Sequence, residues 1–277
     1  MNKPRVVAFQ GEHGAYSEQA ALNHFGITVE TLPCRALQKV FGVVEDGGAE
    51  MGVIPVENSL EGSINLTYDL LLESNLRIIG EIKHRITHCL VGPPGTRLED
   101  IKVVYSHPQA LAQCSVFLDG LGIQTSPTYD TAGSVKMIKE RRLPNSAAIA
   151  SEHAAEIYGL TVLRKGIEDY SQNFTRFFVI SKHEPEPSGR DKTTIVFGTK
   201  HAPGALHRAL GELADRGINL TKIESRPVRT TPWEYYFFVD FEGHSKDYKC
   251  AEALEALRAS ATFLKVLGSY PRATDDI

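Results

Sequence analysis

Short apolar runs alternate with amphipathic stretches through the first two thirds of the chain. Residues 5–9 form the first run, and a glycine-containing turn and an amphipathic stretch over 17–25 follow it. This pattern predicts a buried strand, a tight turn and a helix that Gly26 ends. The same pairing of strand and helix is expected at 29–32 with 34–45, 50–54 with 63–73, 102–105 with 108–118, 124–128 with 132–141, and 147–150 with 152–158. Strands that alternate with helices predict mainly parallel sheet, either as one sheet or as two lobes.

A polar segment with two prolines, residues 183–190, separates this region from a different pattern. Proline disrupts both helix and sheet, so we place a linker at 183–190 between domains over 1–182 and 191–277. The second domain is predicted to have the ferredoxin-like order βαββαβ. Such a module exposes a sheet edge, which favours a homo-oligomer. Its elements are expected at 193–199, 203–216, 218–228, 234–242, 248–261 and 263–269.

Composition narrows the class of protein. The 277 residues have 42% hydrophobic and 23% charged side chains with a net charge of −4, which is typical of a globular chain and gives no basic surface for nucleic acid. The apolar runs are far shorter than the roughly 20 residues that cross a bilayer, so no membrane partner is expected. Four dispersed cysteines and the absence of a signal-peptide pattern predict reduced thiols, no metal site and a cytoplasmic location.

Polar residues follow several predicted strands, where α/β sheets bind their ligands. Glu57, Asn58 and Ser59 end one strand, Ser106 and Gln109 follow another, and Thr131 follows a third. Some of these side chains cap helices, but exposed N–H groups of several helix starts would also attract a small anion, a carboxylate above all. Gly11 and Gly14 lack the complete dinucleotide-binding spacing and are interpreted as a tight turn.

Arg176 lies inside the apolar run 173–180, which contains no acidic residue. A guanidinium in such surroundings needs an anionic partner, which is either a distant glutamate such as Glu57 or the carboxylate of a ligand. Strict alternation along a strand would point Thr175 and Arg176 to opposite faces. Both could touch one ligand only if Thr175 stood at an irregular strand entry.

In the second domain, Gly204-Ala205-Leu206 leads into a helix, and Asn219-Leu220 and Glu224-Ser225-Arg226-Pro227 lie on the next strand. These segments are interpreted either as a turn, a strand and a surface ion pair, or as a small amino-acid pocket between paired domains.

The whole chain resembles the bacterial monofunctional prephenate dehydratases. This resemblance implies an α/β fold, with a two-lobed catalytic domain like the periplasmic binding proteins followed by a ferredoxin-like ACT regulatory domain. His207 stands where relatives often have Val or Tyr, which bears on effector affinity. The resemblance is carried by Val-Ala-Phe-Gln-Gly-Glu-His-Gly-Ala-Tyr-Ser at 7–17, Gly-Val-Ile-Pro-Val-Glu-Asn-Ser at 52–59, Ser-His-Pro-Gln-Ala-Leu at 106–111, Asn-Phe-Thr-Arg-Phe at 173–177 and Glu-Ser-Arg-Pro at 224–227.

The resemblance also implies an activity. Prephenate would lose its ring hydroxyl as water and its ring carboxylate as CO2 to give phenylpyruvate, without a cofactor. Thr175 would donate the proton to the departing hydroxyl or hold that hydroxyl against the true acid, with Glu57 as the candidate relay. L-Phenylalanine would inhibit a homodimer or homotetramer. The residues implied are Asn58, Ser59, Ser106, Gln109, Thr131, Arg176 and Phe177 for prephenate, and Gly204, Ala205, Leu206, Asn219, Leu220, Glu224, Ser225 and Arg226 for phenylalanine.

Three alternatives stay open at this point. An arogenate dehydratase differs only in a substrate that has an amino group on its side chain. A non-catalytic two-lobed receptor would use the same cleft to capture a small anion. A purely regulatory protein would only sense a ligand.

Overall fold

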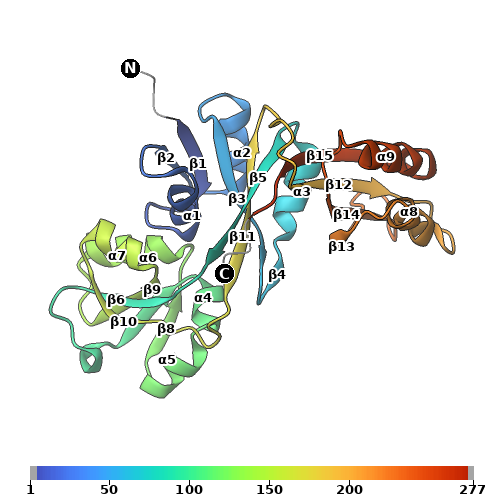
Figure 1. Cartoon of the computed structure of the whole chain (residues 1–277). Coiled ribbons are helices and arrows are strands. Elements are labelled where there is room, and N and C mark those ends of the chain that lie inside the picture. Colours follow the sequence, from blue (N-terminus) through green and yellow to red (C-terminus); the bar gives the residue numbers. More distant parts are fainter. Residues whose placement is uncertain (1–4, 274–277) are drawn as a thin grey trace.

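A computed structural model describes residues 5–273, which form two α/β lobes and a C-terminal domain (Figure 1). Lobe 1 is built on a sheet of order β2-β1-β3-β11-β5, with the short β4 beside β3. Its elements are β1 (Val6–Gln10), α1 (Tyr16–Phe25), β2 (Glu30–Cys34), α2 (Leu37–Glu45), β3 (Met51–Asn58), β4 (Gly62–Ser63), α3 (Asn65–Glu73), β5 (Arg77–Arg85) and β11 (Phe174–Ser181).

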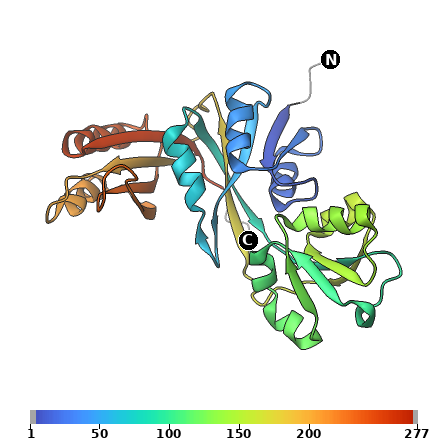
Figure 2. The same cartoon turned by 180° about the vertical axis from the view of Figure 1, so that it is seen from behind.

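Lobe 2 is inserted between β5 and β11 and has a sheet of order β10-β6-β9-β7-β8. Figure 2 shows this lobe from behind, with β5 and β11 running towards it from lobe 1. The apolar pattern alone did not decide whether these strands form one sheet or two lobes. The structure has two lobes, as the family resemblance implied. The elements of lobe 2 are β6 (Cys89–Gly92), η1 (Leu98–Asp100), β7 (Val103–Ser106), α4 (Pro108–Ala112), α5 (Ser115–Leu121), β8 (Gln124–Pro127), α6 (Thr131–Arg141), β9 (Ser146–Ala150), α7 (Glu152–Tyr158) and β10 (Thr161–Lys165).

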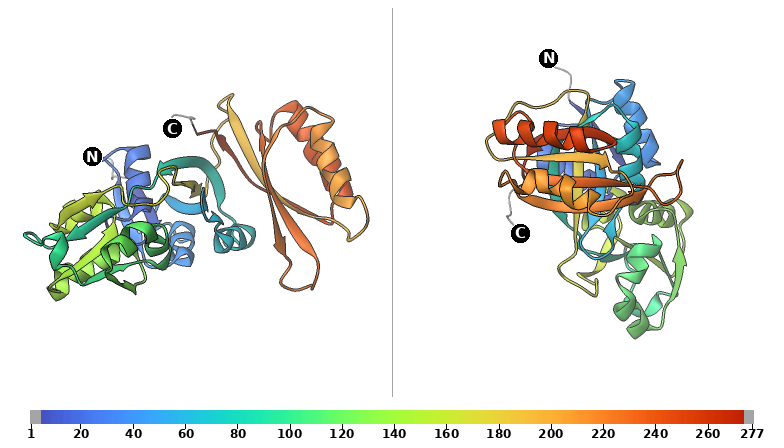
Figure 3. Two further views of the ribbon diagram at one scale, coloured as in Figure 1. Left: turned by 90° about the horizontal axis from the view of Figure 1, so that it is seen from below. Right: turned by 90° about the vertical axis from the view of Figure 1, so that its right-hand side faces the viewer.

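The C-terminal domain has the predicted βαββαβ order in an antiparallel sheet β13-β14-β12-β15. Helices α8 and α9 cover the side of this sheet that faces away from lobe 1 (Figure 3). The other side packs on lobe 1, where Phe178 and Ile180 share a core with Phe238 and Tyr270. Its elements are β12 (Asp191–Gly198), α8 (Ala205–Ala214), β13 (Leu220–Pro227), β14 (Tyr235–Glu242), α9 (Tyr248–Ser260) and β15 (Phe263–Pro271).

The sheets of lobe 1 and lobe 2 are both mixed, whereas the sequence predicted mainly parallel sheet. Strand β11 runs antiparallel to β3 and β5, and β6 runs antiparallel to β9 and β10. Strand β5 was missed because charged residues such as Glu81 and Lys83 interrupt its apolar positions. The helix expected over 108–118 is two helices, α4 and α5, which leave Gln113 and Cys114 between them.

The turn between β1 and α1 is a close contact between the lobes. Gly14 has φ +91°, and a Cβ atom there would lie 2.6 Å from Cα of Ala154 on α7. A side chain would therefore push the lobes apart, since atoms cannot approach this closely. The tight turn predicted for Gly11 and Gly14 is confirmed, and both have positive φ. Among residues 5–273, no helix is both long and apolar enough to cross a membrane.

Candidate active site

A cleft with a volume of about 320 Å³ lies between the two lobes. This volume is within the range of small-molecule sites, which is about 300–1,000 Å³. The lining residues come from both lobes and from the segments that join them. They are Gln10, Tyr16, Ser17, Pro55, Asn58, Ile64, Ile86, His88, His107, Gln109, Ala110, Gln113, Asp130, Thr131, Thr175 and Phe177.

The first turns of three helices border the cleft. Tyr16 begins α1, Pro108 begins α4 beside the lining residue Gln109, and Thr131 begins α6. Free N–H groups and the positive end of the helix dipole favour an anion at such positions. Within the described part of the chain, none of the lining residues is a lysine or an arginine. Asp130 also lines the cleft, with its carboxylate bonded to the N–H of Glu12 at 3.0 Å. A ligand carboxylate would therefore be held by the remaining N–H groups and by neutral polar side chains.

Strands β3 and β11 form the floor of the cleft. Thr175 pairs with Asn58 across the two strands, and Phe177 pairs with Pro55. The register shifts between Arg176 and Phe177, so β3 has an extra residue there. Alternation along β11 directs Thr175 and Phe177 into the cleft, and both side chains line it.

The Thr175 hydroxyl is held from one side only. Its Oγ1 accepts a hydrogen bond of 3.1 Å from Nδ2 of Asn58, and the residue is 8% exposed. Asn58 is itself fixed, because its Oδ1 accepts the backbone N–H groups of Leu60 and Glu61 at 3.0 and 3.1 Å. Since the amide of Asn58 occupies an acceptor position of Thr175, the hydroxyl hydrogen is left to point at a ligand in the cleft.

A chain of hydrogen bonds joins Thr175 and Asn58 to the segments between the lobes. Nδ2 of Asn58 donates to Oδ1 of Asn173 at 2.8 Å, and Nδ2 of Asn173 donates to Oε1 of Gln113 at 2.9 Å. The same Gln113 oxygen lies 2.9 Å from Nε2 of His88, and Nδ1 of His88 lies 2.9 Å from the hydroxyl of Tyr16. The chain orders the cleft side chains through contacts that are far apart in the sequence.

Burial sets the charge state of the two ring residues in this chain. Burial lowers the pKa of His88, although the hydrogen bond to Gln113 opposes this shift. Burial also raises the pKa of Tyr16 well above its usual value. A lowered pKa keeps His88 neutral at pH 7, and the Tyr16 hydroxyl, which lies beside its Nδ1, donates to the carbonyl of Thr87 at 3.0 Å.

Arg176 does not line the cleft, which corrects the expectation that it binds a substrate carboxylate. Its guanidinium points to the opposite face of the sheet, where Nη2 lies 2.7 Å from Glu81 and Nη1 lies 2.5 Å from Asp240. Burial alone would lower the pKa of Arg176, but Asp240, Tyr270 and Glu81 raise it above its usual value. The regular strand alternation decides this orientation, and the partner is Glu81 of β5, not the suggested Glu57.

Glu57 also faces away from the cleft, so its position does not support the proton relay that was expected of it. It stands beside Arg176 in the β3–β11 pairing, on the same face of the sheet. Its Oε1 accepts a hydrogen bond of 2.8 Å from Nζ of Lys222 on β13. An ion pair with the C-terminal domain thus accounts for this carboxylate.

The remaining substrate candidates divide into two groups. Asn58, Gln109, Thr131 and Phe177 line the cleft, whereas Ser59 and Ser106 do not. The Ser59 hydroxyl donates to the carbonyl of Gln172 at 3.0 Å, and the buried Ser106 hydroxyl donates to the carbonyl of Ile149 at 2.6 Å. Both serines tie strand ends together. The cap of α4 is the His107 side chain instead of Ser106.

The effector candidates also divide. Ala205 and Leu206 line a cavity of about 150 Å³ beside α8, and Gly204 is the left-handed residue before that helix. Asn219, Leu220 and Ser225 do not line this cavity. Glu224 and Arg226 face lobe 1, where Glu224 accepts from Ser63 at 2.7 Å and Arg226 lies 3.3 Å from Asp69.

Sequence analysis missed Tyr16, His88, Gln113 and Asn173 as site residues. Tyr16 and Asn173 stand within motifs that were quoted, but neither has a local pattern that indicates a role. His88 follows the unpredicted β5, and Gln113 lies in the unpredicted break between α4 and α5. Recognising the end of α4 at Ala112 would have been needed to find Gln113, because a continuous helix would orient the Gln113 side chain differently.

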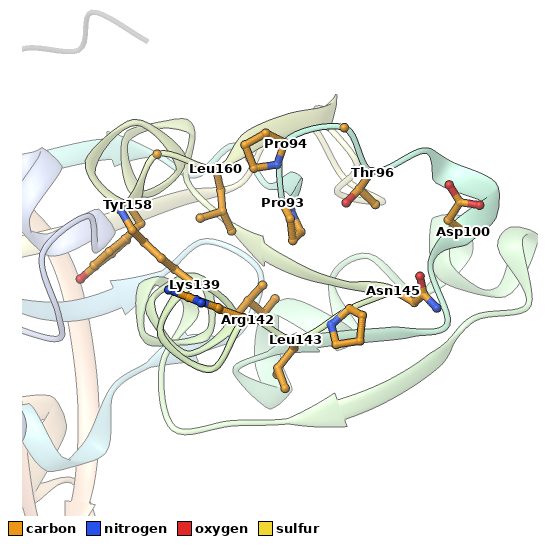
Figure 4. Close-up of a pocket in the computed structure, with 14 residues that line it drawn as sticks. Pro93, Pro94, Thr96, Asp100, Lys139, Arg142, Leu143, Asn145, Tyr158 and Leu160 are labelled. Carbon is orange, nitrogen blue, oxygen red and sulfur yellow. The ribbon is translucent and has the colours of Figure 1, made fainter.

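A second hollow, of about 510 Å³, lies on lobe 2 between the segment at 93–100 and the ends of α6 and α7 (Figure 4). Lys139, Arg142, Leu143 and Tyr158 are among the residues around it. None of its lining residues belongs to the motifs described above, so the candidate site is the cleft.

Two family profiles match the chain. The prephenate dehydratase profile matches residues 7–185, and the ACT domain profile matches residues 193–259. The chain is 46% identical over 283 residues to arogenate dehydratase/prephenate dehydratase 2 of Arabidopsis thaliana, covering 98% of this chain and 74% of that protein. It is 44% identical over 275 residues to the bifunctional chorismate mutase/prephenate dehydratase of Aquifex aeolicus, covering 99% of this chain and 75% of that protein.

Solved structures share the arrangement of all three parts. The prephenate dehydratase of Arthrobacter aurescens in complex with L-Phe matches with a TM-score of 0.89 and 36% identity, over 97% of this chain and 90% of that chain. GqqA, described as a novel type of quorum quenching acylase, matches with a TM-score of 0.89 and 38% identity, over 97% of this chain and 98% of that chain.

Proposed function

Since this chain belongs to the prephenate dehydratase family, we propose that it acts as a carbon–oxygen lyase on prephenate, giving phenylpyruvate, water and CO2. The observation that carries this proposal is the Thr175 hydroxyl on the cleft floor, oriented by Asn58 and bordered by three helix starts. This arrangement offers one proton donor beside a site for carboxylates.

The reaction needs orientation and one proton transfer. Prephenate is a dianion that loses CO2 from its ring while the ring hydroxyl accepts a proton and leaves as water, so one proton is consumed. Formation of an aromatic ring supplies the driving force. The protein must hold the ring so that both bonds break together, and fixed geometry can lower such a barrier strongly.

Thr175 is proposed to donate the proton to the departing hydroxyl, and a proton from solvent then restores the Thr175 hydroxyl before the next turnover. A threonine hydroxyl is a weak acid, so its proton can move only as the carbon–oxygen bond breaks. Nδ2 of Asn58, at 3.1 Å, would stabilise the negative charge that develops on Oγ1. The hydrogen bonds from Asn58 to Asn173 and from Asn173 to Gln113 keep the Asn58 amide in place. An amide group does not titrate, so it orients the Thr175 hydroxyl at any pH.

The substrate carboxylates are proposed to lie at the starts of α1, α4 and α6, near Ser17, Gln109 and Thr131. Helix N-termini bind anions through free N–H groups. Phe177, which is 1% exposed, supplies an apolar surface beside the substrate ring. In this proposal, backbone N–H groups bind the substrate carboxylates, a role that the sequence analysis gave to the guanidinium of Arg176.

The test is incubation of the purified chain with prephenate and, separately, with arogenate. Phenylpyruvate from prephenate is the expected product. Exclusive turnover of arogenate would replace the proposal with an arogenate dehydratase, as the Arabidopsis relative permits. Turnover of neither, with binding of a small anion, would favour the receptor. A third arm should offer an N-acyl amide, because of the acylase relative, and cleavage there would indicate a different chemistry.

Phenylalanine is proposed as the feedback effector, bound by the C-terminal domain near Ala205 and Leu206. The L-Phe complex of the Arthrobacter aurescens enzyme supports this, together with the cavity beside α8. Linkage requires substrate to weaken phenylalanine binding by the factor by which phenylalanine weakens substrate binding. Calorimetry with and without a substrate analogue measures that factor, and equal affinities would contradict binding-linked inhibition.

We further propose a homodimer or homotetramer in the cytoplasm. Strand β13 is at the edge of its sheet, with Ile223 47% exposed, so it offers an apolar edge to a second copy. All four cysteines are free and buried, which suits a reducing compartment. Light scattering on the purified chain tests the oligomer, and a monomer would contradict it.

A further inference from the structure

Directly behind the reacting side chains, the sheet carries two opposite charges. Arg176 and Glu57 are neighbours across β11 and β3, one residue away from Thr175 and Asn58 respectively. Neither charge is free. Arg176 lies 2.7 Å from Glu81 of lobe 1 and 2.5 Å from Asp240, and Glu57 lies 2.8 Å from Lys222.

Both holding residues belong to the ACT domain and stand side by side there. Lys222 of β13 pairs with Asp240 of β14 in the sheet register. Asp240 is fixed by the Thr194 hydroxyl, which donates to its Oδ1 at 2.8 Å, and Lys222 also donates to Ser63 at 3.0 Å. One small patch of the regulatory sheet therefore contacts both strands of the catalytic floor.

This contact lies beside an irregularity in the β3–β11 pairing. The β3–β11 register shifts between Arg176 and Phe177, so regular pairing is interrupted there. A bulge disrupts the ladder locally and increases its twist. Thr175 itself pairs regularly with Asn58 of β3 and with His84 of β5, and the irregular segment begins directly after Arg176, where contacts from behind can act on it.

We propose that Asp240 and Lys222 are positioning residues for the dehydratase reaction. They hold Arg176 and Glu57 and thereby keep Thr175 aligned with Asn58 on the other face of the sheet. The inference rests on the proposed function and extends it, because it makes the regulatory domain part of what orders the active site. A movement of β13 and β14 would then reach Thr175 through these two ion pairs.

The alternative is that these ion pairs only stabilise the contact between the domains. The first experiment compares Asp240→Asn and Lys222→Met with the wild type in kcat, KM and Tm. A small misplacement of a reacting group can lower the rate on the order of 100-fold, so kcat is expected to fall about 10- to 100-fold while KM for prephenate stays unchanged.

Lys265→Met is the matched control. Nζ of Lys265 also crosses the domain contact and donates to the carbonyls of Leu72 and Ser74 at 2.7 and 2.6 Å, but it touches neither β3 nor β11. This variant is expected to lower Tm and leave kcat unchanged. If Asp240→Asn fails to fold, Thr194→Val replaces it, because it keeps the Asp240 carboxylate and removes the hydroxyl that bonds both Asp240 and Tyr270.

A double-mutant cycle separates positioning from proton relay. If Glu57 acts through Lys222, then Glu57→Gln and Lys222→Met together lower kcat no more than either change alone. If Glu57 instead relays protons, the losses multiply, and the positioning role of Lys222 is contradicted. The conservative Lys222→Arg should restore most of kcat.

The possible outcomes are distinct. Folded Asp240→Asn and Lys222→Met variants with wild-type kcat overturn the inference and leave the proposed function in place. A wild-type chain that turns over neither prephenate nor arogenate overturns the proposed function, and the inference fails with it.

Discussion

The two faces of strands β3 and β11 have opposite chemistry. The cleft face presents Asn58, Thr175 and Phe177, and the part of it that the structure describes has no lysine or arginine in its lining. The back face presents Glu57 and Arg176, both in ion pairs with the ACT domain. The charges that local sequence suggests for ligand binding form the contact between domains, and the anion site that we propose uses uncharged donors. The face of the sheet on which a side chain lies therefore indicates its role better than its charge does.

The largest expected effect is on the cleft face. Thr175→Ala should lower kcat about 10²–10⁴-fold, the usual contribution of one placed proton donor, with little change in KM. Thr175→Ser keeps the hydroxyl and should retain much of the activity. Steady-state assays of phenylpyruvate formation measure both variants. Near-normal kcat in Thr175→Ala would remove Thr175 from the mechanism.

The next effect is on the back face. Arg176→Met leaves Glu81 and Asp240 without their shared buried partner, and breaking such a pair costs about 3–5 kcal/mol of folding free energy. Urea unfolding measures this loss. KM for prephenate should not change, because the guanidinium does not reach the cleft.

Arg97→Met is the matched control on the surface. Arg97 forms a pair with Asp100 at 3.1 Å, with its side chain 68% exposed. Exposed pairs contribute little to folding, so Tm should stay the same. A higher KM in Arg176→Met, or equal losses of stability in both variants, would break the contrast between the faces.

A smaller effect concerns pH and His84 of β5, which pairs with Thr175 in the sheet. Burial lowers the pKa of His84 to about 4. Since the unfolded chain binds the proton more readily, the neutral ring stabilises the fold above pH of about 6.5, and this contribution is lost as pH falls towards about 4.

His84→Asn should therefore flatten the fall in stability between pH 6.5 and pH 4 while the rest of the acid response stays. Urea midpoints at a series of pH values measure this. An unchanged slope in the variant would show that His84 is not protonated on unfolding in this range.

Much of the fold could be predicted from local pattern. The βαββαβ order of the second domain and most strand–helix pairs of the first follow from apolar periodicity, which survives without knowledge of contacts. Strand β5 could not be found this way, since Glu81, Lys83 and Arg85 break its apolar pattern. The charged residues of β5 are understood only from the structure, because β5 is an edge strand and Glu81 accepts a hydrogen bond from Lys192 of the ACT domain.

The site was predicted in part. The rule that ligands bind at strand ends pointed to Asn58, Gln109 and Thr131, and the family resemblance added Thr175; all four line one cleft. The roles given to Arg176 and Glu57 failed because their partners are distant in sequence. Glu81 lies 95 residues from Arg176, and Lys222 lies 165 residues from Glu57. Strand alternation, which points Thr175 and Arg176 to opposite faces of the sheet, was the local feature that indicated the orientation of Arg176 correctly.

The absence of a fixed cation among the described residues around the cleft bears on how the reaction finishes. Prephenate enters with two negative charges, and phenylpyruvate leaves with one. A guanidinium would bind both prephenate and phenylpyruvate strongly. Partial charges at helix ends attract a monoanion much less than a dianion, so decarboxylation itself weakens the hold on the product and clears the way for the next turnover.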